Sequence, residues 1–182
     1  MYELSISDNY PNNYWFEYHH PDILGTDFVQ CKKINYDDDS SFVFILKKKV
    51  SEKKLFFYDF YFSNGPIFIS PRLASLFSDK PVLDDMQLVD ASIIVNEVKY
   101  HGYKIINITR TLSCIDIEKS DSQPLLSYLP DGPKKFNKIV FKENVTEQFN
   151  IARCQEHKSC IVMSEQLRKF MVDNHVKGID LL

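Results

Sequence analysis

The sequence predicts an α+β fold, in which aromatic-rich antiparallel strands come first and strand–helix–strand units packed on a mixed sheet follow. Short apolar and aromatic runs of strand length fill the first third of the chain. Further along, two segments place a serine between an apolar run and residues with helical spacing. Of 182 residues, 44% are hydrophobic and 26% are charged, which is the balance of a folded globular protein. We therefore expect a single domain over residues 1–182.

The aromatic strands are expected in three runs. Residues 14–18 and 42–46 combine aromatic and branched apolar side chains, which favour strands. Residues 55–62 form the third run, and a charged segment that includes the lysines at 47–49 separates it from the second. Two such runs around a charged, turn-permissive segment predict a hairpin. The turn residues at 63–66, Ser-Asn-Gly-Pro, end this part of the chain.

Two helices are expected, each with a serine at its N-cap. Ser70 follows an apolar strand at residues 67–69, and Pro71 fits the first helical position, where its missing N–H costs nothing. Ser164 follows a similar strand at residues 161–163, with the same spacing from serine to leucine. This similarity indicates either a weak internal repeat or simply a common way to begin a helix, and the spacing favours neither.

The remaining segments alternate between strands and loops. Further strands are expected at residues 86–95, 103–108, 138–141 and 179–182. A Pro-, Asp- and Ser-rich loop is expected from Asp121 to Pro133. The second helix is expected to end between Asn174 and Gly178, where the glycine can adopt the left-handed conformation.

Composition argues against several classes of function. The formal net charge of −3 lacks the basic excess with which proteins bind phosphate backbones, so no nucleic-acid partner is expected. No apolar run approaches the roughly 20 residues of a membrane span, and no signal-peptide pattern begins the chain. We therefore expect a cytoplasmic protein with no membrane partner. The four cysteines contain no CxxC pair and are expected to be reduced and mostly buried.

Two arrangements of residues could in principle support metal chemistry. Asp22, Glu52 and Lys54 loosely match the Asp…Glu-x-Lys pattern of metal-dependent nucleases, in which carboxylates hold Mg²⁺ and the lysine orients water. Glu-x-Lys is common by chance, so solvated loops are the favoured interpretation. Residues 154–160 contain two cysteines and a histidine. A structural zinc ion needs four ligands in a tetrahedron, and this segment supplies three. We therefore expect no catalytic residue, no metal and no cofactor.

Residues 114–120 alternate between apolar and polar side chains, which predicts a strand with one polar face. Asp116, Glu118 and Ser120 would share that face. Such a face could bind a metal, accept hydrogen bonds from a basic partner, or anchor the loop that follows by capping its backbone. The spacing favours the loop anchor.

The same stretch resembles the signature of a bacterial immunity-protein group, immunity family eleven. Residues 103–108 and 114–120 are similar to its pattern Y-x-(I/L)-(I/L)-N…D-x-E-x-S. Residues 67–73 resemble its (I/V)-x-S-x-x-L helix start, and residues 161–179 resemble its (I/F)-V-S-E-x-L…G-(I/L) end. Met163 departs from the family's usual β-branched residue or Phe, a tolerable core exchange. The resemblance covers residues 67–182 and leaves residues 1–66 as a variable, aromatic, β-rich part.

Members of this family are encoded beside polymorphic toxins of bacterial competition. The resemblance implies an antitoxin that binds and neutralises one cognate toxin, delivered by contact or by secretion, and that catalyses nothing. A small metal-dependent nuclease and a non-catalytic adaptor or structural domain are the alternatives. The toxin could be a nuclease, an ADP-ribosyltransferase or a peptidase. Toxin domains that attack nucleic acid are often basic, so exposed acids and aromatic anchors are candidate contacts. The candidates are Asp37, Asp38, Asp39, Asp84 and Asp85, with Tyr36 and Tyr58. For each of them taken singly, a solvated loop acid or a core tyrosine is the favoured interpretation. Asp116, Glu118 and Ser120 are family-signature positions with no role implied.

Overall fold

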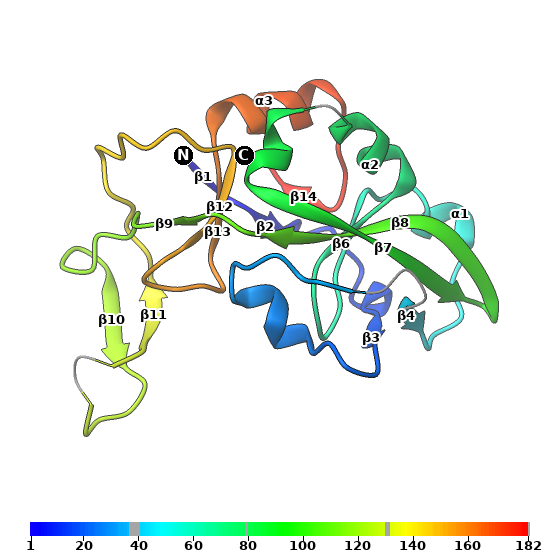
Figure 1. Ribbon diagram of the computed structural model, residues 1–182, viewed down its shortest axis with the longest axis horizontal. Coiled ribbons are helices and arrows are strands. Elements are labelled where there is room, and N and C mark those ends of the chain that lie inside the picture. Colours follow the sequence, from blue (N-terminus) through cyan, green and yellow to red (C-terminus); the bar gives the residue numbers. More distant parts are fainter. Residues whose placement is uncertain (37–40, 79, 130–131, 182) are drawn as a thin grey trace.

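A six-stranded mixed sheet holds the main core of the protein in the computed structural model, which describes residues 1–36, 41–78, 80–129 and 132–181 (Figure 1). Across the sheet the strands are β3 (Glu17–His19), β4 (Phe42–Leu46), β7 (Met86–Val95), β8 (Val98–Ile108), β6 (Phe68–Ile69) and β5 (Phe60–Tyr61). The β4–β7 pair is parallel, whereas the other neighbouring pairs are antiparallel. The predicted α+β class with a mixed sheet is confirmed.

The sheet curls until its two edges meet. Phe16, just before β3, forms a parallel bridge with Ser63, just after β5. The amide of Phe16 donates to the carbonyl of Phe62 at 3.0 Å, and the amide of Asn64 donates to the carbonyl of Phe16 at 3.2 Å. The Asn64 side chain accepts a further hydrogen bond from the amide of Tyr18 at 2.8 Å. Joining the edges in this way pairs backbone groups that an open sheet would expose.

Aromatic rings fill the inside of this curled sheet. Phe68 is fully buried at its centre. Its ring stacks on Phe44 with the centroids 4.0 Å apart and on Tyr61 at 5.2 Å. Phe16 meets it edge-on at 5.1 Å, and Tyr103 lies 6.1 Å away. These rings come from strands distant in sequence, so the aromatic runs of the first third form one core with β8.

The expected hairpin between residues 42–46 and 55–62 is wrong. β4 pairs instead with β3 on one side and with β7 on the other, so no edge remains for a third strand. Residues Glu52–Leu55 form a short helix, α1. The Glu52 carboxylate accepts hydrogen bonds from Asn96 Nδ2 at 3.1 Å and Tyr100 Oη at 2.8 Å, which fastens α1 to the β7–β8 hairpin.

Both predicted serine caps are confirmed. Ser70 Oγ accepts from the amide of Leu73 at the start of α2 (Pro71–Phe77), at 3.1 Å. Ser164 Oγ accepts from the amide of Leu167 at the start of α3 (Glu165–Asp173), also at 3.1 Å. The two units do not share a topology, however. β6 and β7 belong to the same sheet, whereas the strands that flank α3 belong to different sheets.

α3 ends where expected, with Asn174 as its C-cap, but the left-handed residue that follows is not the expected glycine. His175, directly after the C-cap Asn174, takes the left-handed conformation with φ of 52°. Gly178 also has a positive φ, 106°, but it lies beyond the helix end. A Cβ there would lie 2.7 Å from the carbonyl oxygen of Phe60, so glycine is needed for the close approach of two backbones.

A second sheet and a smaller apolar cluster lie beside the main sheet, and we call residues 111–160, which supply most of that cluster, the small lobe. In this sheet the strands are β1 (Tyr2–Glu3), β13 (Ile161–Met163), β12 (Ile151–Cys154) and β9 (Thr111–Leu112). Three buried cysteines, Cys114, Cys154 and Cys160, lie in the small cluster as free thiols, whereas Cys31 is half-buried. β14 (Ile179–Asp180) pairs with β2 (Ser5–Ile6).

The segment expected as a loop from Asp121 to Pro133 is largely a hairpin. β10 (Asp121–Pro124) pairs with β11 (Lys134–Lys138), and the hairpin projects away from the rest of the molecule (Figure 1). The strand expected at residues 138–141 begins earlier, at Lys134, and overlaps the expected range at Lys138; Phe141 forms an isolated bridge with Ile115. Asp121 and Pro124, whose residue types favour turns, lie in β10 itself, so local preference concealed this strand.

Three 3₁₀ turns complete the described elements: Asn12–Tyr14, Gly25–Val29 and Pro81–Asp84. Among the described residues, no helix has both the length and the apolar character required to cross a membrane.

Candidate functional site

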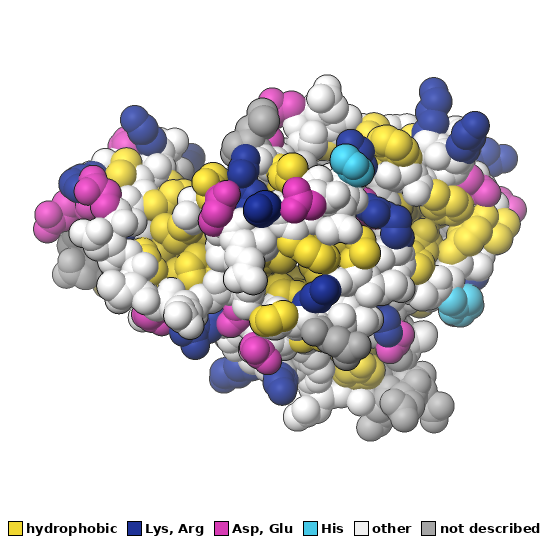
Figure 2. Space-filling model, turned by 90° about the horizontal axis from the view of Figure 1, so that it is seen from above, with side chains coloured by type: hydrophobic (Ala, Val, Ile, Leu, Met, Phe, Trp, Pro, Cys, Tyr) yellow, Lys and Arg dark blue, Asp and Glu magenta, His cyan; other side chains and the backbone are white. Residues whose placement is uncertain are grey.

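An acidic cleft of about 800 Å³ opens between the small lobe and α3. Seen from above, the molecule is notched between the lobe at the left and the rest of the protein (Figure 2). The cleft is lined mainly by residues 141–150, by the end of the Pro81–Asp84 turn and by the start of α3. Five carboxylates line it, set against Lys142 and the amino group of Met1: Asp84, Asp85, Glu143, Glu147 and Glu165. A positively charged partner segment would therefore be attracted to this cleft.

Asp85 holds the wall of the cleft in place. Its side chain is buried, and Oδ2 accepts from the amide of Asn150 at 2.6 Å and from the amide of Ile151 at 3.4 Å. Its carbonyl accepts from the amides of Thr109 and Arg110 at 2.9 and 3.2 Å. Asp85 thus joins the end of β8 to the start of β12, which is a positioning role.

Replacing Asp85 by alanine is expected to lower the free energy of unfolding by about 2 kcal/mol, because two amides lose a charged acceptor in a buried position. Asp85→Asn keeps one acceptor oxygen and should cost less. Asp84→Ala, at the exposed neighbouring position, is the matched control and should change stability by less than about 0.5 kcal/mol. Urea unfolding of the three variants measures this order, and equal values for the two alanine variants would contradict the positioning role.

The structure places the candidate contact residues in different environments. Asp84 is exposed at the cleft, whereas Asp85 is buried. Tyr36 is half-buried with its ring edge-on to Phe42 at 5.3 Å. Tyr58 is half-buried and packs against Tyr10 at 5.0 Å. Both tyrosines therefore contribute to packing as well as to the surface. The candidates Asp37, Asp38 and Asp39 lie outside the described residues.

Residues 116–120 form a turn and not the expected strand. Asp116 Oδ1 accepts from the amide of Lys119 at 3.2 Å, and this backbone hydrogen bond is the main cause of the lowered pKa of Asp116. Ser120 Oγ donates to the carbonyl of Asp116 at 2.6 Å and accepts from the amide of Val140 at 2.9 Å. Glu118 is exposed. These hydrogen bonds agree with the loop-anchor interpretation, since they fasten the base of the β10–β11 hairpin.

The residues of the nuclease interpretation take other roles. The Glu52 carboxylate accepts hydrogen bonds from Asn96 and Tyr100. Asp22 is exposed in the loop after β3, and its amide donates to His20 Nδ1 at 3.1 Å. Lys54 is exposed on α1. In the part of the chain that the structure describes, no group of three or more His, Cys, Asp or Glu residues is arranged to hold a metal ion.

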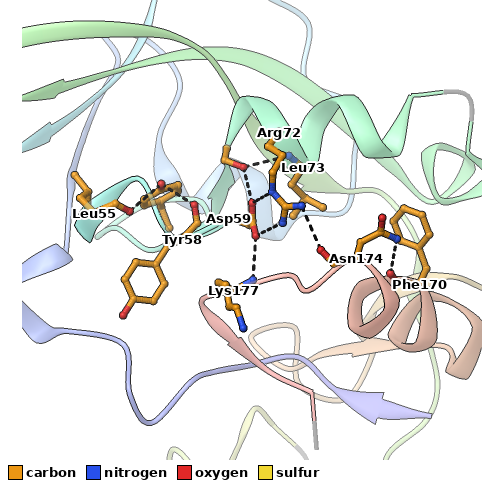
Figure 3. Close-up of polar contacts among 10 residues, drawn as sticks. Leu55, Tyr58, Asp59, Arg72, Leu73, Phe170, Asn174 and Lys177 are labelled. Atoms are coloured by element: carbon orange, nitrogen blue, oxygen red, sulfur yellow. Dashed lines mark hydrogen bonds and ion pairs between the residues drawn. The ribbon is translucent and has the colours of Figure 1, made fainter. Parts of the chain in front are cut away.

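A buried carboxylate that the sequence analysis missed connects three segments (Figure 3). Asp59 is 3% exposed and precedes β5. Its oxygens accept from Ser70 Oγ at 2.9 Å, from Arg72 Nε at 2.9 Å and from the amide of Lys177 at 3.0 Å, and Arg72 Nη2 completes a bidentate ion pair. Arg72 Nη1 also donates to the carbonyl of Asn174 at 3.2 Å. These hydrogen bonds to Asp59 raise the pKa of Arg72.

This Asp59 network joins β5, the N-terminus of α2 and the C-terminal end of α3. A cavity of about 490 Å³ lies beside it, lined by Phe56, Phe57, Tyr103 and His175 among others. The sequence did hold one signal: Asp59 is the single charge in the aromatic run from Leu55 to Phe62. An acid in such a run is buried with partners or marks the end of a strand.

The curled sheet, together with the small lobe, its acidic cleft and its projecting hairpin, defines an α+β protein. A family model described as immunity protein family (Imm11) matches residues 11–182. The chain belongs to this immunity protein family. The match begins well before residue 67, so it includes most of the aromatic part that the motif resemblance left out. A search of curated proteins found no match.

Proposed function

We propose that this protein protects a bacterial cell by binding a cognate toxin directly and neutralising it in the cytoplasm, without catalysing a reaction. Membership of the immunity family supports the general role and suggests a non-enzymatic one. The acidic cleft is the observation that supports direct binding. It is a large, open surface in which five carboxylates outnumber the cationic groups of Lys142 and Met1.

The charges of the cleft suggest how a toxin would approach it. Glu147 is paired with Arg110 at 3.1 Å and Glu165 with Arg168 at 3.8 Å, both at partly exposed positions. The Asp84 carboxylate forms no hydrogen bond or ion pair with the described residues and is exposed to a partner. Complementary charge mainly raises the association rate, which suits a protein that must meet its toxin before damage occurs.

Co-expression with the toxin encoded beside its gene tests the proposal. Direct binding predicts that cells survive and that the two proteins co-purify in a fixed ratio. Survival without any complex would point to an indirect mechanism. Death in spite of soluble expression would exclude neutralisation of that toxin and favour an adaptor or structural role.

Neutralising the cleft should slow association with the toxin. Asp84→Asn combined with Glu143→Gln is expected to reduce the association rate about tenfold at low ionic strength, because long-range attraction to a basic partner is lost. The difference should shrink in high salt, where charges are screened beyond a few ångströms. Surface plasmon resonance at two salt concentrations measures both effects.

The matched control removes the same charge elsewhere. Asp90→Asn combined with Glu97→Gln alters two exposed acids of the β7–β8 hairpin, which do not line the cleft. Association rates reduced equally in both pairs would indicate that only net charge matters and would refute the cleft as the contact surface.

A further inference from the structure

Two buried thiols of the small lobe lie within hydrogen-bond distance of each other. The sulfur atoms of Cys114 and Cys154 are 3.0 Å apart, and both side chains are fully buried. Cys114 follows β9, whereas Cys154 ends β12, so the contact joins segments that are 40 positions apart in the sequence. A disulfide has a sulfur–sulfur distance of about 2.05 Å, so a shift of about 1 Å would bring the two atoms to bonding distance.

Backbone hydrogen bonds hold both cysteines in this position. The carbonyl of Cys114 accepts from the amide of Lys142 at 2.9 Å. The amide of Cys154 donates to the carbonyl of Cys160 at 3.0 Å, and β9 pairs with β12 directly beside the two thiols. Because both backbones are fixed, the thiols stay neighbours, and a bond between them needs no rearrangement of the strands.

The surroundings of the pair favour a thiolate at Cys114. The hydrogen bond with Cys154 is the main cause that holds the pKa of Cys114 below its ordinary value, and Lys142 acts in the same direction. Burial opposes this effect, as does Glu156, whose carboxylate accepts from the amide of Cys114 at 3.3 Å. The same thiol contact raises the pKa of Cys154, which therefore keeps its proton. The thiolate is the nucleophilic form of cysteine, so Cys114 is the sulfur that reacts first.

We propose that Cys114 and Cys154 form a site of reversible oxidation, at which hydrogen peroxide produces a disulfide that ties the segment after β9 to the end of β12. The Cys114 thiolate attacks one oxygen of the peroxide, the O–O bond breaks, and the sulfur becomes a sulfenic acid. The hydroxide that leaves takes up the proton that Cys114 released. The Cys154 sulfur then attacks the Cys114 sulfur, the S–O bond breaks, and water leaves with the Cys154 proton. The pair of sulfurs is thereby oxidised by two electrons, and the peroxide is reduced to water.

Oxidation of these buried thiols requires a brief local opening. Beside Cys114, Lys142 Nζ donates to Ser113 Oγ at 2.7 Å and to Glu156 Oε1 at 3.3 Å, and the Lys142 side chain is 43% exposed. Ion pairs at the surface contribute little free energy, so this network opens at small cost. We therefore expect oxidation over minutes to hours.

The disulfide would stabilise the small lobe. Among the described residues, the smaller apolar cluster has seven buried members, and three of them are cysteines, so its burial energy is limited. The crosslink would close a loop over residues 114–154, which contains the β10–β11 hairpin and the cleft wall at residues 141–150. Closing a loop of this length restricts the unfolded chain and so raises the free energy of unfolding.

Peroxide treatment of the full-length protein tests the proposal. Cys31→Ala is the reference protein, because Cys31 is half-buried and would react separately. Of the four cysteines, three remain in this reference, and we expect peroxide to reduce the free thiols from three to one. A chromogenic thiol reagent counts them in denaturant, and a reducing dithiol should restore all three. Tandem mass spectrometry of proteolytic peptides should join Cys114 to Cys154, and the crosslinked protein should unfold at a temperature at least about 5 °C higher.

Two variants of the reference protein separate the thiols. Cys160→Ala should lose both of its remaining thiols to the crosslink, whereas Cys114→Ala should keep both. If Cys114→Ala does not fold, the peptide map of the reference protein decides between the partners. The proposal is overturned if all three thiols survive peroxide, or if the peptides join Cys154 to Cys160. An unchanged unfolding temperature after crosslinking would refute the stabilisation of the small lobe.

Discussion

Replacing Asp59 by alanine is expected to lower the free energy of unfolding by about 3 kcal/mol, at the lower end of the range for breaking a buried ion pair, because Arg72 is partly solvated. The Asp59 carboxylate is almost fully buried, whereas the Arg72 side chain is 51% exposed. The substitution also removes an acceptor from Ser70 Oγ and from the amide of Lys177. Urea unfolding monitored by tryptophan fluorescence measures the loss.

A double-mutant cycle separates the pair from the rest of the network. Asp59→Ala, Arg72→Ala and the double variant should show a coupling energy of about 1–3 kcal/mol, because the side chains are in direct contact. The surface pair Asp90–Lys104 is the matched control, with Asp90 74% exposed. Asp90→Ala should cost less than about 1 kcal/mol, the usual range for exposed ion pairs. Comparable losses at Asp59 and Asp90 would show that the Asp59 network does not join the three segments.

Replacing Phe68 by alanine is expected to cost about 3–5 kcal/mol, the usual range for removing a buried ring from a core. Phe68 is 0% exposed, and the rings of Phe44, Tyr61 and Phe16 touch it from three parts of the chain. Its strand, β6, has only two residues, so the ring and not the backbone ladder holds it against the core. Thermal and urea unfolding measure the loss.

Two further substitutions test whether the effect comes from burial. Phe68→Leu fills part of the space and should cost less than the alanine change. Phe57→Ala removes an equally large ring that is 64% exposed and should cost less than about 1 kcal/mol. A stable Phe68→Ala protein with unchanged unfolding would mean that the aromatic core repacks freely and does not hold the curled sheet together.

Local signals in the sequence predicted several elements because those signals act over a few residues. The N-caps at Ser70 and Ser164 depend on a side chain reaching an amide three positions further on, and both formed as expected. The strand at residues 86–95 matches β7, and residues 103–108 are the second half of β8. Residues 52–55 became α1, which hydrogen bonds from Glu52 to the distant Asn96 and Tyr100 hold in place. Residues 121–124 became a strand because they pair with β11 in a hairpin, which outweighs the turn preference of Asp121 and Pro124.

The candidate site was less predictable than the fold. Asp84 and Asp85 are adjacent in sequence, yet Asp84 is exposed and Asp85 is a buried acceptor, because only Asp85 meets the amides of Asn150 and Ile151. Those partners lie 65 and 66 positions away. The contact between the Cys114 and Cys154 thiols was likewise concealed, because the two cysteines are 40 positions apart.

The sequence alone determined the α+β class, the helix starts, the absence of a basic excess, and the family signature in residues 67–182. These properties depend on composition or on residues a few positions apart. Only the tertiary structure decided that the sheet closes at Phe16 and Ser63, that Asp59 is paired with Arg72, and that the Cys114 and Cys154 thiols meet. Each of these depends on which distant segments meet, and pairing over long separations is set by the packing of the whole chain and not by local preference.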